Sequence, residues 1–289
     1  MTKALSLIEQ VVQLRLEVEA MRELIQQTRN LVGPMGLPMP DGSMLTQTLH
    51  GLLYYIDPTD TIIAPQMLIY RQWEADLTRL INALLEDATT FVDVGANFGY
   101  FSCLAAKRLA DKPQASVIAV EPNPHLIKLL KRNAEINWSL APIKVIEAAA
   151  GEAAGPVTLF IPAEHGANGG LTNVDQALQV KVDMIRLDDI ISPGLTVDVM
   201  KVDVEGHELG VLKGAADIIQ RSPDIKIIVE WSPNQMRDAG VKVEEFKSFM
   251  IEKGLSPFKC SKTSIEPISW ENLISSGYDN ILFSRQFSK

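Results

Sequence analysis

The chain has 289 residues, of which 46% are hydrophobic and 22% are charged, and its net charge at pH 7 is −9. This length leaves room for one large domain, or for one domain with an extension, and the composition supports a sizeable core. The negative charge, without a run of lysines or arginines and interleaved aromatics, argues against nucleic acid as a partner, because phosphate contacts supply most of that affinity.

The cysteines and the apolar runs exclude further classes of protein. Cys103 and Cys260 belong to no Cys-x-x-Cys pair and no Cys/His cluster, so neither structural zinc nor a disulfide framework is supported. No apolar run reaches 18 residues, and the N-terminus lacks a signal-peptide core. We therefore expect a cytoplasmic protein without stable membrane insertion.

Residues 3–29 contain neither glycine nor proline and predict one helix. Its apolar residues recur at alternating four- and three-residue spacing, a coiled-coil seam of about three heptads: Leu7, Val11, Leu14, Val18, Met21 and Ile25. Glu17 and Arg22 flank this seam as a plausible interhelical pair. Homo-oligomerisation through the helix and packing of the helix on its own domain are equally open, since Ile8, Val12 and Leu24 widen the apolar face.

The domain organisation predicted from these patterns has three parts. An N-terminal helix over residues 1–30 is followed by a linker over 31–42, which holds three prolines and three glycines and should contain neither helix nor strand. The main domain covers 43–289, with its core from about residue 72. Short strands around residues 44–49, 52–56 and 61–69 form an antiparallel N-terminal addition, and an apolar stripe predicts a helix over 72–86.

From Phe91 onward, predicted strands and helices alternate. The strands are 91–94, 116–120, 143–148, 197–204 and 226–231, and the helices are 100–110, 126–137, 209–220 and 243–253. Two further pairs of strands are predicted, an inserted pair at 157–161 and 180–187 and a closing pair at 256–259 and 280–284. Such alternation predicts an α/β fold with a mostly parallel sheet and helices on both faces.

The stretch Phe91–Gly99 reads FVDVGANFG, a buried strand that breaks into a glycine turn and opens onto a helix. Glycines let the backbone approach a ligand closely, and this arrangement often binds a nucleotide-like molecule. The pattern is not G-x-G-x-x-G, and Asp93 in the mouth of the loop would repel a pyrophosphate. A carboxylate there suits a sulfonium, which favours S-adenosylmethionine over NAD.

Ligands in open parallel sheets bind at the carboxyl ends of the strands, so the residues at these ends are candidates for binding. Glu121 follows the second strand and can accept hydrogen bonds from ribose hydroxyls. Glu147, Ala148 and Ala149 follow the third strand, where small residues leave space for an adenine ring. The last two ends carry Asp203 and Glu205, beside Lys201 and His207, and then Glu230 and Trp231.

Three blocks of the sequence, in this order, resemble the FkbM-type S-adenosylmethionine-dependent methyltransferases: FVDVGANFGYFS, VIAVEPNP, and LDDI followed by VMKVDVEGHELGVLKGA. The stretch WEADLTRLI is similar too, and the resemblance covers roughly Asp57 to Ser284. It implies the class I methyltransferase (Rossmann-like) fold and, usually, O-methylation of a sugar, glycan or other natural product. The acceptor would then be a small molecule or a glycan.

The resemblance also implies roles for individual residues. The methionine part of S-adenosylmethionine would be held by Asp93, Gly95, Asn97 and Gly99. Glu121 would take the ribose, with Asn123 in the same turn, and Glu147 to Ala149 would lie near the adenine. Asp203 and Glu205 would line the reacting end.

A hydroxyl acceptor must lose its proton, and Asp203 is the first candidate to take it, because it ends the central strand. His207 and His165, the latter in the glycine-rich loop EHGANGG, are the other candidates. Asp188 and Asp189 could join Asp203 and Glu205 around a magnesium ion, but these two are better explained as the end of the inserted strand, so no metal is expected. The rival functions are a nucleotide-dependent oxidoreductase and a non-catalytic oligomeric protein that keeps the fold.

Overall fold

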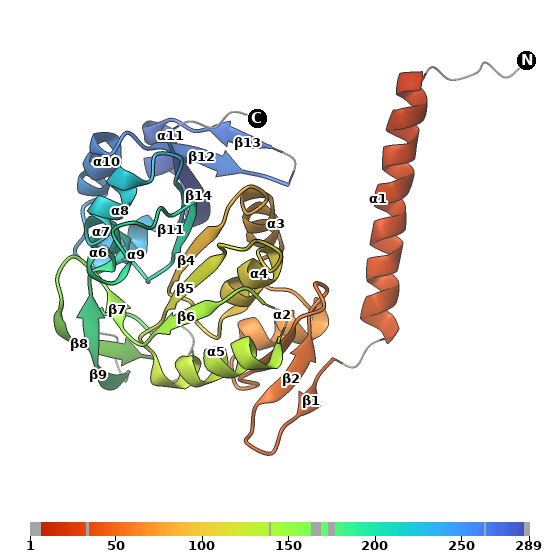
Figure 1. Ribbon diagram of the computed structural model, residues 1–289, viewed down its shortest axis with the longest axis horizontal. Coiled ribbons are helices and arrows are strands. Elements are labelled where there is room, and N and C mark those ends of the chain that lie inside the picture. Colours follow the sequence, from red (N-terminus) through yellow and green to blue (C-terminus); the bar gives the residue numbers. More distant parts are fainter. Residues whose placement is uncertain are drawn as a thin grey trace, which may run out of the picture.

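A computed structural model describes residues 7–32, 35–138, 140–162, 169–172, 177–262 and 264–285. An eight-stranded sheet in the order β13-β12-β14-β11-β10-β4-β5-β6 forms the centre of the molecule (Figure 1). Its parallel strands are β4 (Thr90–Val94), β5 (Ser116–Val120), β6 (Ile143–Ile146), β10 (Val199–Val202) and β11 (Lys226–Trp231). Antiparallel pairings add β14 (Asp279–Ser284), β12 (Ser256–Cys260) and β13 (Ile265–Pro267) at one edge.

Each strand of this sheet divides its side chains between two cores, because successive residues of a strand point to opposite faces. In β4, Phe91 joins the core on one face, while Val92 and Val94 join the core on the other. The first core is covered by α3 (Ala75–Leu84), α4 (Tyr100–Arg108) and α5 (Pro124–Ile136). The second is covered by α7 (Glu208–Lys213), α8 (Ala216–Arg221), α9 (Pro233–Asp238), α10 (Val243–Glu252) and α11 (Trp270–Ile274). The predicted α/β fold, mostly parallel with helices on both faces, is confirmed.

The parts of the fold beyond β6 differ in detail from the prediction. The strand expected over 143–148 ends early, and Ala149–Ala150 form β7 in a second sheet with β8 (Gly155–Ile161) and β9 (Leu178–Ile185). The helix expected over 209–220 is divided into α7 and α8. The division lies at Gly214, which packs so closely on Gly151 that a Cβ would lie 2.0 Å from the Gly151 carbonyl oxygen.

The N-terminal addition is a three-stranded sheet of β1 (Leu37–Pro38), β2 (Met44–Gln47) and β3 (Leu53–Ile56). Strand β1 lies in the segment expected to be a linker without helix or strand. The strand expected over 61–69 is wrong: this segment is the helix α2 (Ile63–Ile69). Asp60 explains the helix, because its Oδ1 accepts hydrogen bonds from the backbone N–H groups of Ile62 (2.8 Å) and Ile63 (2.7 Å) and so satisfies donors at the helix start.

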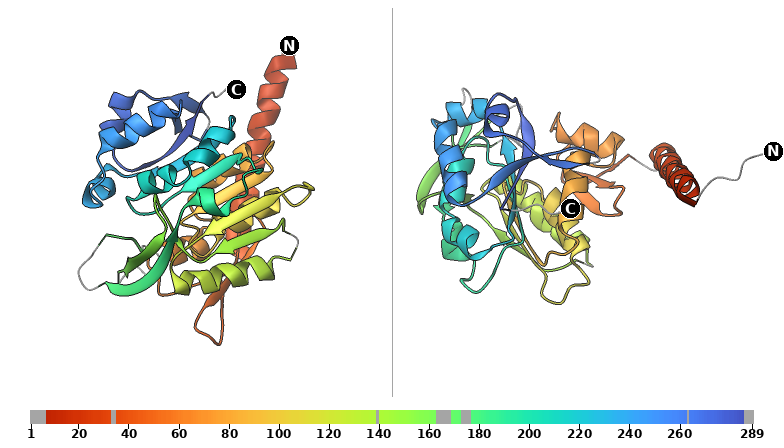
Figure 2. Two further views of the ribbon diagram at one scale, coloured as in Figure 1. Left: turned by 60° about the vertical axis from the view of Figure 1, so that its left-hand side comes forward. Right: turned by 90° about the horizontal axis from the view of Figure 1, so that it is seen from above.

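The N-terminal helix α1 (Leu7–Val32) stands apart from the other elements in Figure 1 and in the right-hand view of Figure 2. Its large apolar side chains between Val11 and Ile25 are 38–62% exposed. Of the two alternatives for this helix, packing on its own domain is therefore not observed. In the part of the chain that the structure describes, no helix is long and apolar enough to cross a membrane.

Candidate active site

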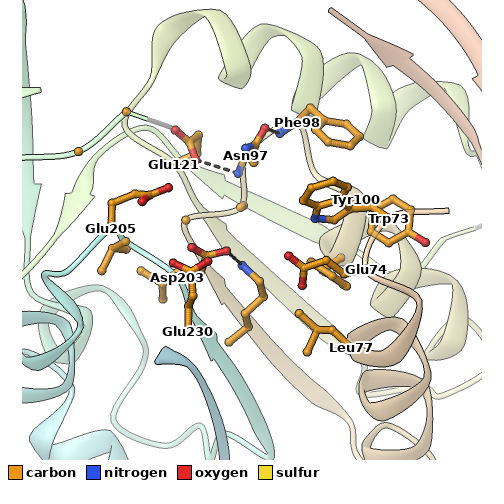
Figure 3. A pocket seen from close by; sticks show the side chains of 18 of the residues that line it. Trp73, Glu74, Leu77, Asn97, Phe98, Tyr100, Glu121, Asp203, Glu205 and Glu230 are labelled. Carbon is orange, nitrogen blue, oxygen red and sulfur yellow. Dashed lines mark hydrogen bonds and ion pairs between the residues drawn. The ribbon is translucent and has the colours of Figure 1, made fainter. Parts of the chain in front are cut away.

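A cavity of about 710 Å³ lies at the carboxyl ends of β4, β5, β10 and β11 (Figure 3). Among the described residues, six acids and two lysines line it. Of the candidate residues from the sequence, ten line this cavity: Gly95, Asn97, Glu121, Ala148, Ala149, Lys201, Asp203, Glu205, His207 and Glu230. The strands therefore bring together most of the side chains that were expected to meet there.

The glycine turn after β4 is fixed against the two neighbouring strands. The N–H groups of Gly95 and Ala96 both donate to the Val120 carbonyl oxygen at the end of β5, each at 3.0 Å. Gly95 has φ +75°, and a Cβ on it would lie 1.8 Å from the Asp203 carbonyl oxygen. Only glycine fits this position, because both the backbone conformation and the space exclude a side chain.

Glu121 holds the next residues of the turn. Its Oε2 accepts the N–H of Asn97 at 2.8 Å, and its Oε1 accepts the N–H of Asn123 at 2.8 Å. The residue is 5% exposed, and burial raises the pKa of its carboxyl to about 7. Glu121 thus lies on the cavity wall with its orientation fixed by backbone groups (Figure 3).

Asp93, Gly99 and Asn123 do not line the cavity. The side chain of Asp93 points to the face of the sheet that α4 covers, where its Oδ2 accepts the Ser102 hydroxyl at 2.6 Å. Gly99 precedes α4 and packs on Leu130, and the Asn123 side chain accepts the N–H of His125 at the start of α5. The expectation that Asp93 lies in the loop mouth is therefore wrong, because strand alternation turns it away.

Lys201 connects buried Asp93 to the cavity. Its Nζ lies 2.8 Å from Asp203 Oδ2 and 3.8 Å from Asp93 Oδ1. Burial lowers the pKa of Lys201, but the nearby charges of Asp203 and Asp93 more than reverse this, so the pKa rises and the amine stays charged. The lysine neutralises part of the acidic charge at the end of β10.

Three carboxylates, which we call the carboxylate cluster, meet at the ends of β10 and β11: Asp203, Glu205 and Glu230. One oxygen of each lies within 4.8 Å of the others. Gln235 Nε2 donates to Glu205, and the Tyr278 hydroxyl donates to Glu230 Oε1 at 2.7 Å. Burial and then repulsion by Asp203 raise the pKa of Glu205 to about 7 and that of Glu230 well above its usual range.

Of the remaining candidate residues, one lines the cavity, one lies outside the described residues and one lies away from the cavity. His207 lines the cavity, its Nε2 lies 3.3 Å from Thr172 Oγ1, and burial lowers its pKa. His165 lies outside the described residues. The expectation that Glu147 lies near the adenine is wrong, because its exposed side chain pairs with Lys131 and does not line the cavity.

The comparison with protein families decides the class of this site. The family described as "Methyltransferase FkbM domain" matches residues 93–256, more than half of the chain. The chain belongs to the FkbM methyltransferase family. The protein is thus a methyltransferase of the class I α/β fold, and the oxidoreductase alternative is set aside.

Two curated methyltransferases are similar in sequence to this FkbM protein. Methyltransferase sdnD of Sordaria araneosa is 30% identical over 194 residues, which are 56% of this chain and 74% of sdnD. Hexuronic acid methyltransferase AglP of Haloferax volcanii is 33% identical over 151 residues, 51% of this chain and 58% of AglP. The match to AglP therefore spans less than two thirds of that relative.

Solved structures give weaker similarities. The O-methyltransferase TomG from Streptomyces achromogenes, determined with SAM, has a TM-score of 0.43 at 13% identity, with 73% of this chain and 80% of TomG covered. The Bacillus cereus O-methyltransferase in complex with SAH has a TM-score of 0.44 at 12% identity, covering 73% and 81%. At these values the similarity bears on neither substrate nor mechanism.

The cofactor of this FkbM methyltransferase is S-adenosylmethionine, and the residues of the cavity fit it. The acids of the cavity outnumber its lysines, which suits a sulfonium cation. The buried carboxylate of Glu121 lines the cavity, as do the small residues Ala148 and Ala149.

Sequence reasoning missed several residues that line the cavity: Trp73, Glu74, Gln235, Tyr278 and Asn280. Asn280 Nδ2 donates to Glu74 Oε2 at 3.2 Å, which joins residues from opposite ends of the domain. Burial, then the charge of Asp203, raises the pKa of Glu74 to about 7. The only signal for Glu74 was its place in the family-like stretch WEADLTRLI.

Two further residues that the sequence analysis named, Trp231 and Asp188, have structural roles. Trp231 is fully buried, and Asp188 accepts N–H groups at the start of α8.

Proposed function

We propose that this methyltransferase transfers the methyl group to a hydroxyl oxygen of a sugar, a glycan or another natural product rich in hydroxyls. The observation that carries the proposal is the carboxylate cluster, which faces the cavity beside the Tyr278 hydroxyl and the His207 ring. Carboxylate oxygens accept hydrogen bonds from hydroxyl groups, and several of them together suit an acceptor with several hydroxyls. The relative AglP is by its name a hexuronic acid methyltransferase, which supports a sugar acceptor.

The acidic cavity favours a neutral acceptor over an acidic one. A carboxylate on the acceptor offers only hydrogen-bond acceptors to the carboxyl oxygens that line the cavity, whereas a hydroxyl can donate to them. We therefore expect a neutral polyol or glycoside, in contrast to the hexuronic acid of AglP's name.

We assign the cofactor to the part of the cavity next to the glycine turn. Gly95 and Asn97 would border its methionine part, Glu121 would accept hydrogen bonds from the ribose hydroxyls, and Ala148 would lie along the adenine. Bound S-adenosylmethionine supplies an electrophilic methyl group on sulfur. Asp203 and Glu205 then border the reacting end, where alignment of the acceptor oxygen is the main demand on the protein.

For the proton of the acceptor hydroxyl, the geometry favours His207 over Asp203. Asp203 is engaged by Lys201 at 2.8 Å. His207 lines the same cavity, and burial lowers its pKa, so its ring is neutral at pH 7 and able to accept a proton. His207→Gln should then lower kcat while the affinity for S-adenosylhomocysteine stays unchanged.

We further infer that the chain forms a parallel homodimer through α1. The exposed seam has β-branched Val11, Val18 and Ile25 at one core position of the heptad, which favours two parallel strands. In a parallel pair, Glu17 of one helix faces Arg22 of the other. An antiparallel pair would place Arg15 and Arg22 against each other, so the charges favour the parallel dimer.

Calorimetric titration with S-adenosylhomocysteine tests the cofactor site. We expect binding to the wild type and at least tenfold weaker binding to Glu121→Gln, which loses the buried carboxylate. Glu147→Gln is the matched control, because it changes an exposed carboxyl outside the cavity and should bind like the wild type. Equal affinity in all three proteins would contradict the assignment of Glu121.

The acceptor class is tested by S-adenosylhomocysteine release from S-adenosylmethionine. A panel of neutral glycosides and polyols is compared with the matching hexuronic acids and with amines. Turnover with neutral hydroxyl compounds is expected, and turnover confined to amines, or products methylated only at the carboxylate by mass spectrometry, would overturn the proposal of hydroxyl methylation.

A further inference from the structure

The carboxylate cluster has the spacing of a cation site. One oxygen each from Asp203, Glu205 and Glu230 lies within 4.8 Å of the other two. A hard divalent cation with oxygen ligands at about 2.0–2.6 Å places its ligand atoms about 3–5 Å apart. Three carboxylates at this distance repel one another unless a cation or protons lie between them.

Glu230 provides a second observation that points to a ligand. The residue is 9% exposed, and its Oε1 accepts the Tyr278 hydroxyl, but its Oε2 is buried and has no hydrogen-bond partner among the described residues. Figure 3 shows the carboxylates of Glu230 and Asp203 side by side. A buried acceptor without a donor is uncommon and costly, so a missing partner is the direct explanation.

Gln235 repeats this pattern at the same place. Its Nε2 donates to Glu205, while its Oε1 is buried and finds no donor within the described parts of the chain. Two buried oxygens, the carboxyl Oε2 of Glu230 and the amide Oε1 of Gln235, therefore lack a hydrogen-bond donor among the described residues. Both Gln235 and Glu230 line the cavity, and these two oxygens are buried in its wall.

The lysine beside the cluster does not fill this role. Lys201 Nζ lies 2.8 Å from Asp203 Oδ2 and is shared with Asp93, 3.8 Å away on its other side. One ammonium group thus serves two aspartates, and Glu205 and Glu230 are left without a cation at hydrogen-bond distance among the described residues.

We propose that Asp203, Glu205 and Glu230 bind a divalent cation of the Mg²⁺ or Mn²⁺ type at the acceptor end of the cavity. The donors are all oxygens, which these hard cations prefer to the nitrogen and sulfur ligands of zinc. Gln235 Oε1 is positioned beside the cluster as a further neutral oxygen. The remaining coordination positions belong to water and to the oxygens of the acceptor.

The role of this cation rests on the proposed hydroxyl methylation. A bound cation polarises an acceptor hydroxyl and makes its proton easier to remove. The hydroxyl proton passes to His207, the oxygen forms a bond to the methyl carbon, and the S–C bond breaks with its electron pair on sulfur. The products are the methyl ether, neutral S-adenosylhomocysteine and a protonated His207. The cation would also attract acceptors with two adjacent hydroxyls, which can chelate it.

Direct binding of Mn²⁺ to the full chain tests the site without any acceptor. The protein is stripped with a chelator, exchanged into metal-free buffer and titrated with MnCl₂, and free Mn²⁺ is measured by electron paramagnetic resonance. One saturable site per chain is expected, with at least tenfold weaker affinity in Glu230→Gln and unchanged affinity in Glu147→Gln. The absence of a saturable site, or equal affinity in Glu230→Gln, would overturn the proposal.

S-adenosylhomocysteine titration of the same samples separates this proposal from the proposed function. Glu230→Gln should still bind S-adenosylhomocysteine, which shows that the variant is folded. If the stripped enzyme methylates a hydroxyl acceptor at the full rate, the cation proposal fails while the function stands. If S-adenosylhomocysteine does not bind but Mn²⁺ does, the cation site stands and the proposed function fails.

Discussion

Unfavourable backbone conformations are concentrated around the cavity. Of the four described non-glycine residues with positive φ, three line it: Glu74, Asn97 and Glu205. Each such conformation costs on the order of 1–3 kcal/mol and persists only where neighbouring contacts fix it. Hydrogen bonds to Glu121, Asn280 and Gln235 provide these contacts. The strain therefore marks residues whose orientation the site requires.

Gly95 allows the sharpest test at the residue scale. In Gly95→Ala, the new Cβ would meet the Asp203 carbonyl oxygen and the residue would keep an unfavourable positive φ. We expect the free energy of unfolding, measured by urea denaturation, to fall by at least about 2 kcal/mol. S-adenosylhomocysteine binding should be lost as well.

Gly194→Ala is the control for this substitution, since nothing lies within 4 Å of a Cβ there. Its unfolding free energy should stay within about 0.5 kcal/mol of the wild type. A similar loss in both variants would mean that Gly95 is not specially constrained.

The residues at the strand ends were predictable from the sequence, and the cavity residues from outside the alternating region were not. Glu121 and Asp203 follow buried apolar runs, and parallel topology places the ends of such runs together. Glu74 and Tyr278 reach the cavity from elements before and after the alternating region, through contacts such as Asn280 to Glu74. Such contacts between distant segments leave no local pattern in the sequence.

At the scale of elements, single hydrogen bonds and close contacts decided the cases in which periodicity failed. Residues 61–69 have an apolar run that suits a strand, yet Asp60 accepts the N–H groups of Ile62 and Ile63, which favours the start of α2. The apolar spacing over 209–220 suits one helix, but the close packing of Gly214 on Gly151 divides it. Long, strongly periodic segments such as α3 and α10 were predicted correctly, because their apolar faces determine them.

At the scale of elements, the testable prediction concerns dimer formation through the helix α1. Val18→Asp places a charge in the proposed seam and should convert the dimer to a monomer, because a buried, unpaired carboxylate costs several kcal/mol. The mass by light scattering should change from twice to once 31.9 kDa.

Leu16→Asp is the matched control on the opposite side of α1. Leu16 is 56% exposed and lies outside the heptad seam, so this variant should remain a dimer. A wild-type protein that is monomeric at micromolar concentration, or equal dissociation of both variants, would contradict the proposed dimer.

At the scale of the whole molecule, the fold places several acids in a partly dry interior. Among the described residues outside the carboxylate cluster, three glutamates have a pKa raised to about 7 from 4.5, in each case mainly by burial: Glu74, Glu121 and Glu208. Alternating strands and helices made the sheet predictable, but burial of these acids depends on how loops fold over the strand ends. Because these acids titrate near pH 7, their burial makes the free energy of unfolding depend on pH.

The sign of the pH dependence follows from proton binding. Between pH 4.5 and about 8, these glutamates bind more protons in the native state than in the unfolded chain, so the free energy of unfolding falls as pH rises. His50 and His207 act in the opposite sense, because burial lowers their pKa and stability is gained as pH rises toward 6.5. The gain from the histidines levels off about one unit above the pKa of 6.5 that they have in the unfolded chain, so between pH 6.5 and 8 the larger loss from the glutamates outweighs it.

We therefore expect the ligand-free, chelator-treated protein to lose on the order of 2 kcal/mol between pH 6.5 and 8. Scanning calorimetry should show Tm falling by roughly 5 °C over this range. Glu208→Gln should reduce the fall, because Glu208 is 1% exposed and its Oε2 lacks a partner among the described residues. Glu147→Gln, an exposed change, should leave it as in the wild type. A Tm that rises from pH 6.5 to 8 would mean that these acids are already ionised and solvated in the native protein.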